Sequence, residues 1–314
     1  KISVSNGSIS NFSVTSSTVY TATFTPSSDG VCAVTVGVNT FTDVNGNNNT
    51  ETTQFNWTYD SIAPTITSVT STTTNNSYGV GNSINITLTF TKNVTLSGGN
   101  ILVTLETGTT DRIVSISSVS DSTTAVGTYI VQSGDISNAL TVNSIGLSGG
   151  TLQDIAGNDM IFNIGTNLEA SSAIVIDTTA PTITSITSTT NNGSYKVGDP
   201  DINITINFSE SVTLTGSILV TLETGTTDRT VSISDFSNLT TTTGNYEIIA
   251  GDTTSALTVK TIELVSGATL KDAAGNDISS FNIGTNLTAS SSIIIDTTAP
   301  TVTNSIVSSN STST

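Results

Sequence analysis

Histidine is absent from this chain of 314 residues, and Cys32 is its only cysteine. Histidine is the most frequent general base and metal ligand in proteins, so its absence argues against most acid–base and transition-metal chemistry. A single cysteine excludes an internal disulfide. Cys32 alternates with Val34 and Val36, as a small core residue would. No nucleophile stands beside a base, and we predict that the chain is not an enzyme.

Basic residues are also scarce: 7 Lys and Arg face 24 Asp and Glu, which leaves a formal net charge of −17. Such a chain has no basic patch for phosphates, which excludes nucleic acid as a partner, and it attracts cations instead. No apolar run approaches the roughly 20 residues of a membrane span. We expect an exported segment that does not cross a membrane, with its export signal and any anchor elsewhere.

Good helix formers are rare, whereas Thr, Val and Ile are abundant and Gly, Asn and Ser separate them. In two stretches apolar residues alternate strictly with polar ones: Ile84, Ile86, Leu88 and Phe90, then Ile202, Ile204, Ile206 and Phe208. Period-two alternation places one face of a strand in a core and the other in solvent. With about seven such runs per repeat, the sequence predicts an all-β fold of immunoglobulin-like β-sandwiches.

The chain repeats itself. Residues 101–112 recur unchanged as residues 218–229, and an Ala-Pro-Thr segment begins at Ala63, Ala180 and Ala299. These marks define four segments: a partial module at 1–62 that lacks its front strands, full modules at 63–179 and 180–298, and residues 299–314, which are either the first strand of a further module or a donor strand. The short linkers contain proline, which favours a semi-rigid, elongated rod of modules.

Two motifs occur once in each full module: an Asp-Thr-Thr-Ala-Pro boundary at 177–181 and 296–300, and an Asp-x-Ala-Gly-Asn loop at 154–158 and 272–276. In this pairing the chain resembles the bacterial immunoglobulin-like repeats of large surface adhesins and biofilm-associated proteins, strongly over residues 63–300 and more weakly over 1–62. The resemblance implies an extracellular or cell-surface location. It also implies spacer modules, often rigidified by calcium, with adhesion confined to other domains.

The acidic loops are the candidate metal sites. Calcium takes six to eight oxygen ligands from carboxylates, amides and carbonyls. In a sandwich, the loop before the last strand lies near the linker that enters the module, so each loop is expected beside the preceding linker. The candidate Ca²⁺ ligands are Asp60, Asp154, Asn158, Asp159, Asp177, Asp272, Asn276 and Asp277. The alternative is that these Asp and Asn residues only shape turns.

Two further features have a plain and a functional interpretation. Asn85 and Asn203 lie in Asn-x-Thr sequons and point away from the apolar face, so both are candidate glycosylation sites. Glu106, Asp111 and Arg112 flank a turn, which is repeated with Glu223, Asp228 and Arg229. Paired carboxylates there would suit glycoside hydrolysis, but we expect a hairpin with an exposed Asp–Arg pair.

Three functions remain open. The first is a structural stalk or fibre of a cell-surface adhesin, whose partners are further modules of the same chain. The second is a subunit of a filament or surface layer, joined head to tail by β-strand addition into the incomplete first module. The third is a carbohydrate-binding module, which the low aromatic content (5%) disfavours.

Overall fold

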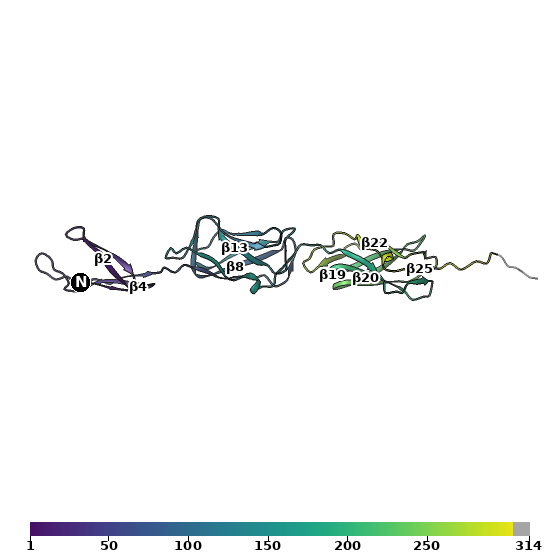
Figure 1. The fold of residues 1–314 in the computed structure, drawn as a ribbon, viewed down its shortest axis with the longest axis horizontal. Helices are drawn as coiled ribbons and strands as arrows, with labels where there is room; N and C mark the ends of the chain where they lie inside the picture. Colours follow the sequence, from purple (N-terminus) through teal and green to yellow (C-terminus); the bar gives the residue numbers. More distant parts are fainter. Residues whose placement is uncertain (304–314) are drawn as a thin grey trace, which may run out of the picture. The chain divides into compact units, whose positions relative to one another are not determined.

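The computed structural model describes residues 1–303, and residues 304–314 of the predicted donor strand lie outside this range. The described chain is nearly all β: strands hold 55% of the residues and helix 2%. The all-β prediction is confirmed. Figure 1 shows strands and connecting loops along the chain. The predicted module boundaries and the rod remain predictions.

The contacts divide the chain into two compact units. The first unit comprises residues 1–75, 83–129 and 139–173, and the second comprises residues 76–82, 130–138 and 174–314. The division passes through the 63–179 repeat, because three short strands of that repeat belong to the second unit.

The first 62 residues form two small sheets of the first unit. Their strands are β1 (Ile2–Ser5), β2 (Gly7–Val14), β3 (Tyr20–Pro26), β4 (Gly30–Val36) and β5 (Phe55–Tyr59). One sheet has the order β1-β4-β5, and the other is the β2-β3 hairpin. The rings of Trp57 and Phe24 pack in a T-shaped arrangement, with centroids 4.6 Å apart.

The rest of the first unit is a two-layer sandwich. Its elements are β6 (Thr65–Thr70), β8 (Ser83–Ser97), β9 (Ile101–Glu106), β10 (Arg112–Ile116), β11 (Ser122–Ile130), β13 (Thr141–Leu147), β14 (Thr151–Gln153), β15 (Ile161–Thr166) and the 3-10 helix η1 (Leu168–Ala170). One sheet has the order β11-β8-β6-β15, with β14 also on β8, and the other has the order β10-β9-β13. The predicted alternation is confirmed, since Ile84, Ile86 and Leu88 are fully buried.

The second unit contains three short strands, β7 (Ser77–Tyr78), β12 (Ile136–Ser137) and β16 (Val175–Asp177), which form a sheet of order β12-β16-β7. The remaining elements are β17 (Ile183–Thr187), β18 (Gly193–Tyr195), β19 (Ile202–Glu223), β20 (Arg229–Tyr246), β21 (Thr253–Thr254), β22 (Thr258–Leu264), β23 (Thr269–Asp272), β24 (Ile283–Thr285), the 3-10 helix η2 (Leu287–Ala289) and β25 (Ile293–Asp296).

The long strand β19 organises the second unit, because it pairs with β17, β20, β22 and β23. Its register with β20 shifts three times between Asn207 and Ser217, so the pairing of these two strands is bulged there. Gly216 lies within this stretch at φ +92°, a conformation that favours glycine. The apolar side chains of both halves of β19, Ile204 and Val220 among them, join one buried core.

The same topology recurs in the two repeats. In the first unit β6 pairs antiparallel with β8 and parallel with β15. In the second unit β17 pairs antiparallel with β19 and parallel with β24. The repeated sequence therefore builds the same local arrangement twice, and residues at equivalent positions can be compared directly.

Candidate functional site

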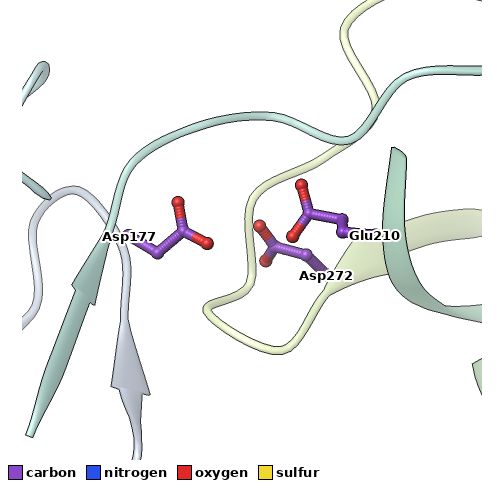
Figure 2. A group of neighbouring side chains, drawn as sticks. All are labelled: Asp177, Glu210 and Asp272. Carbon is purple, nitrogen blue, oxygen red and sulfur yellow. The ribbon is translucent and has the colours of Figure 1, made fainter. Parts of the chain in front are cut away.

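Three carboxylates of the second unit converge: Asp177 from the end of β16, Glu210 from the middle of β19 and Asp272 from the end of β23. One oxygen atom of each lies within 4.8 Å of the others, and Figure 2 shows the three side chains pointing toward one another. Asp272 is buried, whereas Asp177 and Glu210 are half-buried. We call Asp177, Glu210 and Asp272 the carboxylate group.

The Asp-Ala-Ala-Gly-Asn loop fixes Asp272 in this group. The Asn276 backbone N–H donates to Asp272 Oδ1 at 2.8 Å, and its side-chain Nδ2 donates to Asp272 Oδ2, also at 2.8 Å. Gly275 adopts φ +89°, which closes the tight turn between these two residues. The same Asn276 Nδ2 donates to the backbone carbonyl of Asp177 at 2.9 Å, so the loop is bound to the linker.

The electrostatics of the carboxylate group favour a cation. Burial, followed by repulsion from Asp272 and Asp177, raises the pKa of Glu210 above its usual range. Carboxylate and carbonyl oxygens are the ligands that Ca²⁺ prefers. The donor set of Asp177, Glu210 and Asp272 therefore fits a hard divalent cation.

The equivalent place in the first unit is built differently. There Lys92 Nζ lies 2.7 Å from Asp60 Oδ2 and 3.0 Å from Asp154 Oδ2, and it also donates to the carbonyl oxygen of Ile62. Asn158 Nδ2 donates to the carbonyl of Asp60 at 3.1 Å, as Asn276 does to Asp177. We call Asp60, Lys92 and Asp154 the lysine group.

The lysine group is held in its charged form. Burial raises the pKa of Asp154, but hydrogen bonds from Asn158 and Lys92 outweigh it and lower the pKa to about 2. The hydrogen bond from Lys92 also lowers the pKa of Asp60. Burial lowers the pKa of Lys92, yet its bonds to Asp60 and Asp154 outweigh this and raise it. Since a lysine ammonium lies between these two carboxylates, the residues present do not fit a metal ion.

Comparison with known proteins identifies the N-terminal part of the chain. Residues 1–59 match the family model described as a bacterial Ig-like domain. The match covers 59 of the 314 residues, and it shows that this part of the chain is similar to a bacterial Ig-like domain. No curated protein matches the chain. Ig-like domains of this family are generally non-enzymatic and are often found in surface proteins, which supports a structural protein of the surface or extracellular space.

Residues 1–59, all of which the structure describes, bury only two apolar side chains, Cys32 and Ala33. Large side chains such as Phe12, Phe41 and Phe55 are 58–66% exposed. A groove of about 890 Å³ opens over strands β1 and β2, lined by Ile2, Val4, Ile9, Phe12, Tyr20 and Phe41, among others. An incomplete sandwich would expose its apolar face in this way.

Two of the predicted ligands lie apart from the groups. Asp277 pairs with Lys271 at 2.9 Å, and Asp159 accepts from Gln153 Nε2 at 2.9 Å. Sequence reasoning missed Lys92 and Glu210. Each follows the last apolar residue of its alternating run by two positions, but this spacing alone does not place either side chain beside the loop. In the part of the chain that the structure describes, no helix is long and apolar enough to span a membrane.

The prediction of an exposed Asp–Arg pair was wrong for Asp228 and Arg229. Arg229 Nε donates to Asp252 at 2.7 Å instead, and Asp228 pairs with Lys260 at 2.9 Å. Asp252 is only 1% exposed and also accepts from the Tyr246 hydroxyl at 2.6 Å. Arg229 and the Tyr246 hydroxyl share the buried acceptor Asp252, and this arrangement outweighs a pair between Arg229 and its exposed neighbour Asp228. The reason is that a buried donor without a partner is costly.

The candidate glycosylation sites lie on the outer face of their strands, as expected from the alternation. Asn85 and Asn203 are half-buried between fully buried neighbours. Each amide oxygen accepts from the hydroxyl of its own sequon threonine, Thr87 at 3.0 Å and Thr205 at 2.9 Å. Attachment of sugar at Asn85 and Asn203 stays a prediction.

Proposed function

We propose that this chain is a non-enzymatic segment of the stalk or fibre of a cell-surface adhesin, and that calcium closes the boundary between its two full repeats. The observation that carries the proposal is the carboxylate group, because it joins a linker residue to two residues of the repeat that follows. Asp177 precedes the boundary proline, Pro181, whereas Glu210 and Asp272 come after it.

A bound Ca²⁺ would act on the linker in two ways. It would replace the mutual repulsion of Asp177, Glu210 and Asp272 by attraction to a common ion. It would also add a second connection between linker and loop, beside the hydrogen bond from Asn276 to the Asp177 carbonyl. A linker held at two points bends less than a linker held at one, which is the property that a stalk requires.

The test is thermal unfolding of the whole chain in Ca²⁺ and in chelator, for the wild type and for Asp177→Asn. The wild type should melt at a lower temperature in chelator, and Asp177→Asn should lose most of this difference. Asp277→Asn is the matched control, since Asp277 pairs with Lys271 and lies outside the carboxylate group. Identical melting temperatures of the wild type in Ca²⁺ and in chelator would contradict the calcium site, and the loop would then serve only as a turn.

The open groove favours a second candidate, a filament subunit assembled by β-strand addition. A strand from another copy would cover the exposed Phe12 and Phe41 and pair with a free sheet edge. Residues 301–314, mostly outside the described residues, supply Val302, Ile306 and Val307 as the donor. Burying apolar surface at about 25 cal/mol per Å² would drive the association.

Deletion of residues 301–314 tests this candidate. Polymerisation should be lost, while far-ultraviolet circular dichroism stays unchanged because the two full repeats keep their own cores. A variant with Val302 and Val307 changed to Asp keeps the length of the tail and should fail in the same way. Filaments that persist in both variants would exclude the tail as the donor.

A further inference from the structure

The lysine group and the carboxylate group occupy equivalent places in two copies of one repeat. Lys92 stands two residues after Phe90, and Glu210 stands two residues after Phe208. The surrounding residues are shared, with Asp60 and Asp177 before the boundary, Asp154 and Asp272 at the end of an equivalent strand, and Asn158 and Asn276 in the loop. The two boundaries therefore differ in the sign of one side chain.

Lys92 is seated among its acceptors rather than lying loosely on the surface. Its ammonium has three N–H donors, and three acceptors receive them: Asp60, Asp154 and the carbonyl of Ile62. The Asp154 side chain is only 2% exposed, and the Lys92 side chain is 25% exposed. An ion pair with one buried partner and every donor occupied is more than a solvated surface pair.

We infer that Lys92 is an internal counter-ion that holds the linker at Asp60 to the loop at Asp154 without a metal ion. The residue at this position of the repeat, Lys92 or Glu210, then decides whether the boundary between modules depends on a divalent cation. The half of this inference that concerns Glu210 rests on the calcium site proposed above. The half that concerns Lys92 rests on its own contacts.

Charge balance supports the equivalence. Two carboxylates and one ammonium give the lysine group a net charge of −1. Three carboxylates give the carboxylate group −3, and one divalent ion brings it to the same −1. The equivalent carboxylates of the lysine group already hold a cation between them. This is an observation independent of the acidic cluster, and it points to a cation at Asp177, Glu210 and Asp272.

Exchange of the two residues tests the inference. The full chain is prepared as wild type, Lys92→Glu, Glu210→Lys and the double swap, and calcium binding is measured by isothermal titration, with terbium luminescence as a second probe. Lys92→Glu should bind one more ion than the wild type, Glu210→Lys one fewer, and the double swap the same number. Lys271→Glu is the control, because Lys271 pairs with Asp277 outside both groups, and it should not change the number of ions.

The outcomes separate the inference from the proposed calcium site. If the wild type binds no ion at this place but Lys92→Glu gains one, the role of Lys92 stands and the calcium site fails. If Glu210→Lys loses an ion but Lys92→Glu gains none, the calcium site stands and the role of Lys92 is overturned. No gain or loss in any variant overturns both.

A milder change covers the case in which Lys92→Glu does not fold. Lys92→Gln removes the charge without adding a carboxylate and keeps much of the length of the side chain. Asp60 and Asp154 would then face each other without a counter-ion, and the melting temperature should become sensitive to Ca²⁺ in a background that carries Glu210→Lys. Insensitivity to Ca²⁺ in that folded variant would overturn the role of Lys92.

Discussion

Asp252 is the position at which the stabilisation of the turns in the second unit can be tested most sharply. Its carboxylate accepts three hydrogen bonds: from Arg229 Nε at 2.7 Å, from the Tyr246 hydroxyl at 2.6 Å and from the Ile249 backbone N–H at 3.1 Å. Burial raises the pKa of Asp252, but these bonds outweigh it and lower the pKa below its usual range. The carboxylate is therefore charged at neutral pH. Asp252→Ala would leave all three donors without this acceptor.

The size of the effect follows from burial. Each buried donor without a partner costs about 1–3 kcal/mol, and removal of one member of a buried ion pair costs about 3–5 kcal/mol. The Arg229 side chain is 27% exposed and recovers some hydration, whereas Tyr246 is only 2% exposed and does not. We therefore expect Asp252→Ala to lower the free energy of unfolding by about 3 kcal/mol, near the lower end of the range for a buried ion pair.

Hydrogen exchange of the full chain, followed by mass spectrometry, measures this loss locally. A loss of about 3 kcal/mol makes protected amides of β20 and β22 exchange roughly 150-fold faster. Tyr246→Phe removes one of the three donors, so Asp252→Ala should cost less in that background. Asp228→Ala is the control, because Asp228 forms an exposed pair with Lys260. If the amides of Asp252→Ala exchange no faster than those of this control, the Asp252 carboxylate does not stabilise the second unit as predicted.

Two further predictions concern acid and the bulged stretch of β19. Because the pKa of Asp154 is lowered to about 2, its contribution to stability is complete above the ordinary carboxyl pKa of about 4 and is lost as the pH falls toward 2. The melting temperature should fall over that range, and Lys92→Met should reduce the fall; an unchanged fall would contradict it. Gly216→Val should destabilise the second unit by about 2 kcal/mol or more, since φ is +92° and a Cβ would lie 2.7 Å from Ala268 Cβ. Gly267→Ala is the comparison, because Gly267 lies at φ +85° with no atom within 4 Å of an added Cβ, so this variant lacks the steric clash. Chemical denaturation measures the loss of unfolding free energy in both variants, and equal losses would contradict the prediction.

Local patterns predicted the strands well. The alternation from Ile84 to Phe90 and from Ile202 to Phe208 lies within β8 and β19, with the apolar side chains buried. The length of β19 was not predictable from alternation, because the strand continues through three register shifts and Gly216, where the pattern breaks. A bulged strand keeps its pairing with neighbours that are distant in sequence, and periodicity does not record such partners.

The candidate sites were predictable in part. Topology placed each Asp-x-x-Gly-Asn loop beside the preceding linker, and Asn158 and Asn276 do bond to the carbonyls of Asp60 and Asp177. Lys92 and Glu210 carry no local motif, since each is one charged residue in a strand rich in Thr and Ser. Only the fold brings them to the loop. The partner of Arg229 was missed for the same reason, because Asp252 lies 23 residues away along the chain.

Small-angle X-ray scattering of the whole chain in Ca²⁺ and in chelator tests most directly whether a cation stiffens the boundary at Asp177. The wild type should lose stiffness in chelator, which would appear as a changed distance distribution. Glu210→Lys, in which a lysine replaces the ion, should give the same profile in both conditions. Superimposable profiles of the wild type with and without Ca²⁺ would show that no cation stiffens the boundary at Asp177.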